Sequence, residues 1–208
     1  APISMVTRIA EALVVPTNAP WSTGAEFIAA ARTAKSAPTM ASTGTGSVPH
    51  LAMELLVDAT KTALTHVPYR GAAPATTDVI AGHVDGFFAD IPGLMPFIKA
   101  GKVKPIGVAA ERRHPLLPDV KTFDEMGIKG VYADNWYALF TGRAVPTTEI
   151  ERVNQAMKRT LANEDVRAKL LASGAVPEYS TPAALATLLK QDSEKWSRII
   201  KAKKITAD

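Results

Sequence analysis

The alternation of short apolar runs with longer amphipathic stretches is the feature that most constrains the fold of this chain. Apolar runs at Ile9–Val15, Thr39–Ser42, Ala63–Val67 and Val84–Ala89 are each followed by turn residues and a segment of helical pattern. Strands separated by about ten to fifteen helical residues predict βαβ units and a parallel sheet. We therefore expect an α/β fold in which ligands bind beyond the carboxyl ends of the strands.

The helical segments carry recognisable start and stop signals. Ser or Thr stands before several of them, and Gly82 follows another, as expected of N-caps and of a C-terminal glycine. After Pro146 the pattern is almost entirely helical. The expected helices include about Ser22–Ser36, Ala72–Ala81, Thr147–Ala162, Glu164–Ala172 and Pro182–Lys203.

One turn consists of small hydroxyl residues spaced by glycines and opens directly into a helical pattern. Its residues are Thr43, Gly44, Thr45, Gly46 and Ser47. Glycine allows positive φ and a close approach between backbone and ligand. A helix N-terminus adds unpaired N–H donors at the positive end of the helix dipole. The turn therefore predicts a site for a small anion, most simply a carboxylate or phosphate.

Polar residues also follow two further strands of the expected sheet. Tyr69, Arg70 and Gly71 form a turn after one strand, and Asp90 directly follows another. Because parallel strands end at the same edge of a sheet, these residues should lie beside the glycine-rich turn. The two turns and Asp90 are expected to line a single cleft.

Each candidate side chain has two possible roles at this stage. Arg70 can form a bidentate salt bridge with a ligand carboxylate or simply be solvated. Asp90 can accept hydrogen bonds from a ligand or cap the helix beginning near Pro92, and Tyr69 can contact a ligand or pack. His50, in the first turn of a helix, can contact the ligand or hydrogen-bond locally. We expect His66 to pack at a strand end.

Composition and motifs exclude several classes of function. The net charge is only +4 and its basic residues are scattered, which argues against nucleic-acid binding. The basic cluster between Lys195 and Lys204 fits the solvated face of a packed helix. The chain has no cysteine, which excludes disulfides and thiolate metal sites. Its four histidines lack the spacing of zinc ligands, and His83 and His114 are expected on surface loops.

Enzymatic signatures are also absent. Ser47, His50 and Asp90 could be drawn as a triad, but a serine and histidine three residues apart at a helix start rarely align for catalysis. No Gly-x-Ser-x-Gly elbow occurs, and no lysine follows Gly46 as a P-loop requires. We therefore expect a binding protein that needs no cofactor.

The order of six motifs along the chain closely resembles one protein family. The motifs are TGTGSxxHL from Thr43, HVPYRG from His66, AGxVD from Ala81, IKAGK from Ile98, LPDVxT from Leu117 and NWY from Asn135. The family comprises the substrate-binding receptors of tripartite tricarboxylate transporters, also called Bug-type receptors. The resemblance covers nearly the whole chain.

The resemblance implies an α/β receptor of the periplasmic-binding-protein type II architecture, with two lobes that close like a hinge. Two crossover strands, near Ala12–Val15 and Trp136–Leu139, would join the lobes. Residues 18–133 would form the ligand-binding lobe. Residues 1–17 and 134–208 would form the crossover strands and the C-terminal helical part of the other lobe. The chain has nothing like the Pro-Phe-x-x-Gly-Gly loop of the family, so we expect the first lobe to be incomplete.

The implied partners are a small carboxylate and the membrane permease subunits that receive it. The implied location is the periplasm, although the chain shows no signal peptide of its own. Apolar surface left by an incomplete lobe should also favour self-association. The alternative at this stage is the ligand-sensing effector domain of a cytoplasmic transcription regulator, which can share this architecture.

Overall fold

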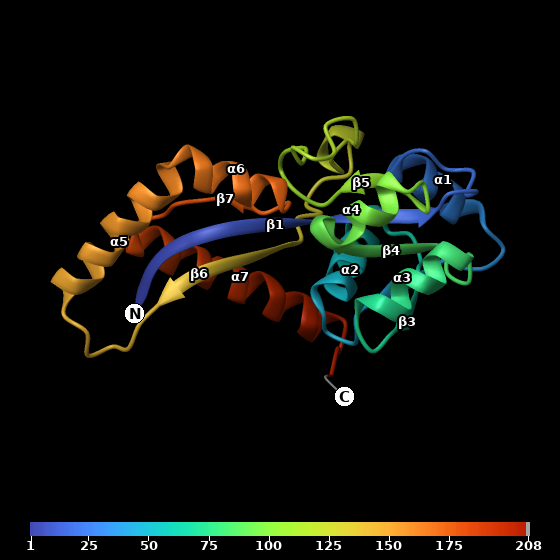
Figure 1. The fold of residues 1–208 in the computed structure, drawn as a ribbon. Coiled ribbons are helices and arrows are strands. Elements are labelled where there is room, and N and C mark those ends of the chain that lie inside the picture. Colours follow the sequence, from blue (N-terminus) through green and yellow to red (C-terminus); the bar gives the residue numbers. More distant parts are fainter. Residues whose placement is uncertain (207–208) are drawn as a thin grey trace. The chain divides into compact units, whose positions relative to one another are not determined.

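The chain folds into two compact units, each of which is described by itself. The computed structural model describes residues 1–206. The small unit contains Ala1–Ile9 and Asn135–Arg198, and the large unit contains Ala10–Asp134 together with the described residues from Ile199 on. Strands β1 (Pro2–Pro16) and β6 (Asp134–Phe140) and helix α7 (Pro182–Ala202) each contribute to both units (Figure 1).

This division differs from the expected boundaries at 18–133. The second half of β1 lies in the sheet of the large unit, and residues 199–206 belong to that unit as well. Strand β1 is also much longer than the expected Ile9–Val15 strand. Its first residues lack both a continuous apolar run and a clear alternation, so a hydrophobicity pattern does not reveal them.

The sheet of the large unit has the strand order β3-β2-β4-β1-β5. Its remaining strands are β2 (Thr39–Ser42), β3 (Thr65–Pro68), β4 (Gly86–Asp90) and β5 (Val103–Val108). Strand β2 pairs parallel with β3 and β4, whereas β1 pairs antiparallel with β4 and β5. The expected parallel pairing is therefore found for β2, β3 and β4, whereas β1 runs in the opposite direction, which the sequence did not reveal. Hydrophobic runs show where strands lie but not their direction.

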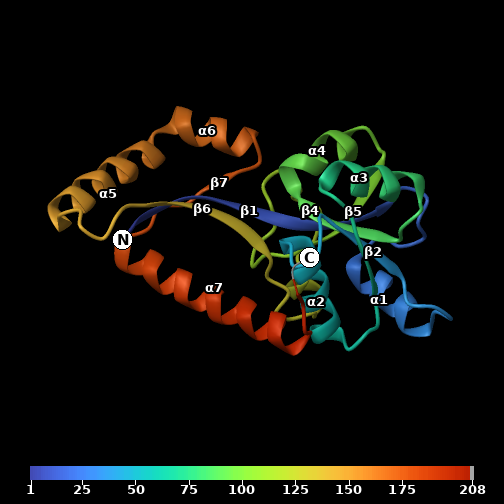
Figure 2. The same cartoon turned by 90° about the horizontal axis from the view of Figure 1, so that it is seen from below.

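Helices cover both faces of this sheet (Figure 2). Helices α3 (Ala72–Ala81) and α4 (Ile91–Lys99) lie on one face, and α1 (Gly24–Thr33) and α2 (Val48–Thr60) lie on the other. Neighbouring strand residues Phe87 and Phe88 point to opposite faces, and both are fully buried. Each such side chain contributes about 1.5–3 kcal/mol to stability, so both layers hold the sheet in place.

Local signals explain the helix bounds in the large unit. Thr23 accepts a hydrogen bond from the Glu26 amide, and the Glu26 carboxylate accepts one from the Ser22 amide. This capping box begins α1 where the sequence predicted, although α1 ends before the expected Ser36. Helix α3 has the predicted bounds because Gly82 adopts φ of 76° and ends it. Beyond β5, the chain forms a 3₁₀ turn, η1 (Asp124–Met126).

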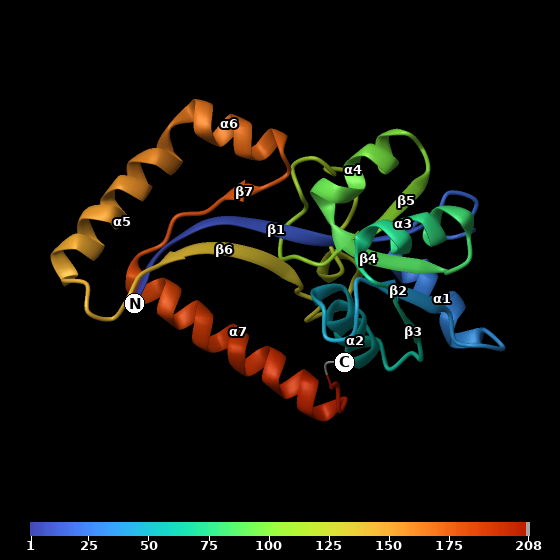
Figure 3. The same cartoon turned by 60° about the horizontal axis from the view of Figure 1, so that its bottom comes forward.

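The small unit is built on the first half of β1. Strands β6 and β7 (Val176–Pro177) both pair with β1. Helices α5 (Thr147–Ala162) and α6 (Glu164–Ala172) lie on one side of these strands, and α7 lies on the other (Figure 3). The buried Asn154 ties the unit together, because its amide nitrogen donates to the carbonyls of Ile3 and Ser180. Helices α5 and α6 have their predicted bounds.

Candidate functional site

Three helix N-termini meet at one edge of the large unit's sheet. Strands β3, β2 and β4 are adjacent and parallel, and each leads directly into a helix: α3, α2 and α4 respectively. The connections are the glycine-rich loop, which we define as Thr43–Ser47, the turn Tyr69–Gly71, and Asp90 itself. The structure thus brings together at one edge the turns that the sequence placed there.

The glycine-rich loop is shaped by two positive-φ glycines and by its own hydrogen bonds. Gly44 has φ of 137° and Gly46 has φ of 76°. The Ser47 hydroxyl donates to the Gly44 carbonyl at 2.7 Å, so Ser47 makes no side-chain cap for α2. The Gly44 amide donates to the Ser42 hydroxyl at 3.2 Å. Only glycine adopts such φ values without strain, which explains the glycine spacing.

The amides of the loop fall into two groups. Those of Gly44, Gly46 and Ser47 are used inside the protein, by Ser42 Oγ, His50 Nδ1 and the Gly44 carbonyl. Within residues 1–206, the Thr43 and Thr45 amides make no such bond. The loop can therefore offer these two N–H groups, and the hydroxyls beside them, to an anion.

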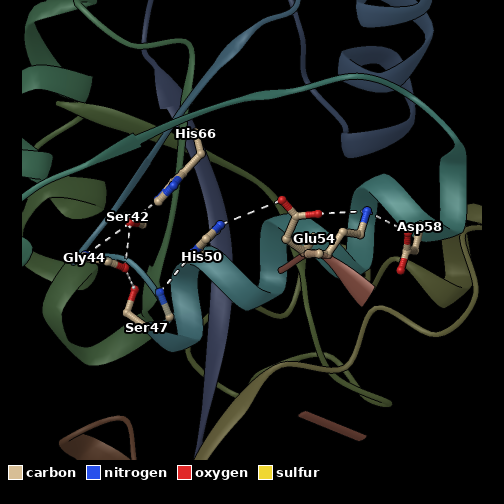
Figure 4. Close-up of polar contacts among 9 residues, drawn as sticks. Ser42, Gly44, Ser47, His50, Glu54, Asp58 and His66 are labelled. Carbon is tan, nitrogen blue, oxygen red and sulfur yellow. Dashed lines mark hydrogen bonds and ion pairs between the residues drawn. The ribbon is translucent and has the colours of Figure 1, made fainter. Parts of the chain in front are cut away.

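Two stacked histidines lie beside the loop (Figure 4). The His50 and His66 rings are parallel to within 6°, with centroids 3.6 Å apart. His66 Nε2 lies 2.6 Å from the Ser42 hydroxyl, and His50 Nδ1 accepts the Gly46 amide at 3.0 Å. Burial, followed by the proximity of His50, lowers the pKa of His66 to about 4, so its ring is neutral at pH 7.

A row of charges continues from His50 along α2. His50 Nε2 lies 3.8 Å from Glu54 Oε1. Lys203 follows α7, and its Nζ lies 2.9 Å from Glu54 Oε2 and 2.8 Å from Asp58 Oδ1. The contacts with His50, followed by those with Lys203, outweigh burial and lower the pKa of Glu54. Burial disfavours the charged form of Lys203, but the carboxylates of Glu54 and Asp58 outweigh that effect and raise the pKa of Lys203.

The second turn presents a cation and holds its tyrosine inward. The Tyr69 hydroxyl donates to Asp78 Oδ2 of α3 at 2.6 Å, and burial together with this bond raises the pKa of Tyr69 to about 12. Arg70 is exposed. Gly71 adopts φ of 102° and stands immediately before α3. The side chain of Arg70 is therefore open to solvent, whereas that of Tyr69 ties the turn to α3.

Asp90 ends β4 and stands at the N-cap position of α4, but its side chain makes no capping hydrogen bond. Of the two roles expected for Asp90, the structure does not show the capping one. Its backbone lies opposite Glu11 of β1 in the sheet register, and Glu11 is buried.

Sequence reasoning missed part of this arrangement. The hydrogen bond of His66 to Ser42 was not predicted, and neither was the salt bridge of Lys203 to α2. His83 is exposed as expected, but the surface position expected for His114 is wrong, because its side chain is buried. His114 Nδ1 accepts a hydrogen bond from the Leu116 amide, which stabilises the buried imidazole.

Neither a metal site nor a membrane span is found in the part of the chain that the structure describes. No three His, Asp or Glu side chains there are grouped to hold a metal ion. Likewise, none of the helices in residues 1–206 combines the length and apolar character needed to cross a bilayer.

Comparison with known proteins gives a consistent family match. The model of the family described as "Tripartite tricarboxylate transporter family receptor" matches residues 1–205. A protein of a Pseudomonas species, called UPF0065 protein in the tcbD-tcbE intergenic region, is 32% identical over 208 residues. The match covers all of this chain but 62% of that protein, so the chain spans about three fifths of its length.

Solved structures show the same fold. The structure described as R. palustris Rpa4515 with adipate is 26% identical with a TM-score of 0.83, over 99% of this chain and 69% of that one. MatC from Rhodopseudomonas palustris with bound malate is 29% identical with a TM-score of 0.76, over 96% of this chain and 69% of that one. The expected family and architecture are confirmed, and nothing in these comparisons supports a transcription regulator.

Proposed function

The chain belongs to the tripartite tricarboxylate transporter receptor family, and on that premise we propose that it captures a small carboxylate in the periplasm for delivery to a membrane transporter. Members of this family are solute-binding receptors rather than enzymes. Relatives of known structure carry adipate and malate, which are both dicarboxylates. A dicarboxylate is accordingly the ligand class that we propose.

The observation that carries the proposal is the convergence of three helix N-termini on a loop with two uncommitted amides. Each N-terminus favours a nearby anion by about 0.3–1 kcal/mol. Hydrogen bonds from the Thr43 and Thr45 amides to a carboxylate are charge-assisted, and each contributes about 1.5–3 kcal/mol. Together these contributions suit an anion of one or two charges.

We assign the ligand contacts by the chemistry of each group. The loop of Thr43, Gly44, Thr45, Gly46 and Ser47 holds one carboxylate, through the amides of Thr43 and Thr45. Arg70, which is exposed, and the N-terminus of α3 after Gly71 meet a second carboxylate. Asp90 accepts a hydrogen bond from a ligand hydroxyl or a bound water. His50 and Tyr69 support the loop and the turn from inside, because His50 Nδ1 and the Tyr69 hydroxyl are already hydrogen-bonded to protein.

Thermal denaturation with a matched ligand panel tests this proposal. Malate and adipate are the test ligands, adipamide is the neutral control, and 1,5-diaminopentane is the cationic control. At a ligand concentration of 100 Kd, binding stabilises the folded state by about 2.7 kcal/mol. For a chain of this size, that corresponds to a rise in Tm of about 5–10 °C. The panel is applied to this chain and to a version preceded by the N-terminal segment of a relative.

A rise in Tm with the dicarboxylates alone would support the anion site. A rise with adipamide or the diamine but with neither dicarboxylate, in both versions of the protein, would contradict it.

We further propose two kinds of protein partner. The family relationship suggests delivery to permease subunits of a tripartite transporter. Self-association is suggested by large apolar side chains of the small unit that are exposed, namely Tyr137, Leu139, Phe140 and Leu189. Sedimentation velocity over a range of concentrations tests self-association, which Tyr137→Ser together with Leu139→Ser should weaken. A monomer at all concentrations would contradict it.

A further inference from the structure

Salt bridges between the C-terminal segment and α2 point to a residue that acts on the glycine-rich loop from a distance. Lys203 and Ile205 follow α7 and belong to the large unit. A Cβ atom placed on Gly46 would lie 3.8 Å from Ile205 Cγ2, so this segment lies beside the loop. Lys203 bridges Glu54 and Asp58 on α2, the helix that the loop opens.

The hydrogen bonds of His50 require one particular form of its ring. The Gly46 amide donates to Nδ1, so Nδ1 carries no proton. Nε2 faces the Glu54 carboxylate at 3.8 Å, too far for a hydrogen bond but close enough to favour a proton on that nitrogen. Both neighbours therefore select the neutral ring with its proton on Nε2.

Lys203 protects this form by compensating the charge of Glu54. Without Lys203, an uncompensated Glu54 carboxylate would face Nε2, and a carboxylate stabilises positive charge on an imidazole beside it. A doubly protonated ring has an N–H at Nδ1 and cannot accept the Gly46 amide. His66, stacked on His50 at 3.6 Å, bears no charge at pH 7 and so supplies no compensation. Figure 4 shows the row from the loop through His50 to Glu54 and Asp58.

We propose that Lys203 is a positioning residue for the carboxylate site, which acts through Glu54 and His50 to fix the Gly46 amide and hence the conformation of the glycine-rich loop. This inference deepens the proposed function and rests on it for its effect on affinity. Its effect on His50 is independent of any ligand.

The test combines nuclear magnetic resonance of histidine nitrogens with calorimetry on four forms of the chain. They are the wild type, Lys203→Met, Lys203→Arg and, as a matched control, Lys201→Met, in which the lysine is exposed two residues away. Imidazole ¹⁵N signals at pH 7 report which nitrogens of His50 are protonated. His66→Asn assigns the signals of the stacked pair.

The wild type should show His50 protonated on Nε2 only. In Lys203→Met the signal of His50 Nδ1 should move toward the position of a protonated nitrogen. Affinity for malate or adipate should fall about fivefold, which is the change expected when one hydrogen bond that orders the loop is lost. Lys203→Arg should restore both properties, and Lys201→Met should change neither.

Three results would overturn the inference. They are a wild-type His50 protonated on Nδ1, unchanged His50 signals in Lys203→Met, and a loss of affinity in that variant without a change at His50, which would show a merely structural role. If the wild type binds neither dicarboxylate, the proposed function fails, and the His50 signals of the four forms still decide whether Lys203 acts on this ring.

Discussion

Replacing Gly46 with alanine tests whether the glycine-rich loop needs the positive φ of this residue, because alanine is strained in that conformation. Gly46 has φ of 76°, and the added Cβ would meet only Ile205 Cγ2, at an ordinary contact distance of 3.8 Å. No steric clash therefore contributes. A left-handed conformation costs an alanine about 1–2 kcal/mol relative to glycine, and this is the whole expected effect.

The protein can respond to this strain in two ways. If the loop keeps its conformation, the free energy of unfolding falls by about 1–2 kcal/mol and affinity for the ligand is kept. If the loop relaxes in the free protein, stability is kept, and ligand affinity falls by a factor of about 5–30 instead. The sum of the two losses should stay near the strain energy, because the bound loop needs positive φ in either case.

Urea denaturation measures the free energy of unfolding, and calorimetry with malate and adipate measures the ligand affinity of the same preparations. Gly46→Asn should recover part of the loss, because asparagine tolerates the left-handed region better than alanine. Gly130→Ala is the matched control, since Gly130 has φ of 83° in a turn outside the site and its Cβ would meet no atom within 4 Å. It should lower stability without changing affinity. If Gly46→Ala changes stability and affinity by less than about 0.5 kcal/mol in total, the reasoning is refuted.

Three further outcomes follow from particular contacts. The pKa of His66 is lowered from 6.5 to about 4, so the unfolded chain takes up this proton first as the pH falls, and stability should drop from pH 6.5 toward pH 4. His66→Gln should flatten that part of a plot of urea midpoint against pH; an unchanged slope would contradict the assignment. Gly107→Ala places a Cβ 2.9 Å from Phe123 Cζ and should destabilise by about 1–3 kcal/mol in urea denaturation, whereas Gly93→Ala has open space and should not; equal effects would show that the core is not tightly packed there. Tyr69→Phe removes the bond to Asp78 and should cost about 0.5–1.5 kcal/mol, and the absorbance of one tyrosine should titrate near pH 12 in the wild type but not in this variant.

Elements with strong local signals could be predicted from the sequence. Helix α3 lies between Gly71 and Gly82, two positive-φ glycines that leave little freedom in its bounds. Asn163 ends α5 and caps α6 with its side chain, and both helices have their predicted limits. The expected edge of the sheet was also found, because parallel strands linked by helices must end on the same side.

Features set by long-range contacts could not be predicted. The direction of β1 depends on which strands it inserts between, and hydrophobicity does not report this. His66 and Ser42 meet because β2 and β3 pair in a register that no local pattern specifies. Lys203 stands in a basic cluster whose sequence pattern is typical of the solvated face of a helix. Its contact with α2 joins residues about 150 positions apart, which no local pattern reports.

The central claim is that the loop Thr43–Ser47 holds the carboxylate through its backbone. A titration of the ¹⁵N-labelled chain with malate and adipate, followed by amide signals, tests this claim most directly. The amides of Thr43 and Thr45 are predicted to shift downfield in a saturable way, as hydrogen bonds to a carboxylate require, and adipamide should leave them unchanged. Saturable dicarboxylate binding that moves other amides and leaves those of Thr43 and Thr45 in place would contradict the claim.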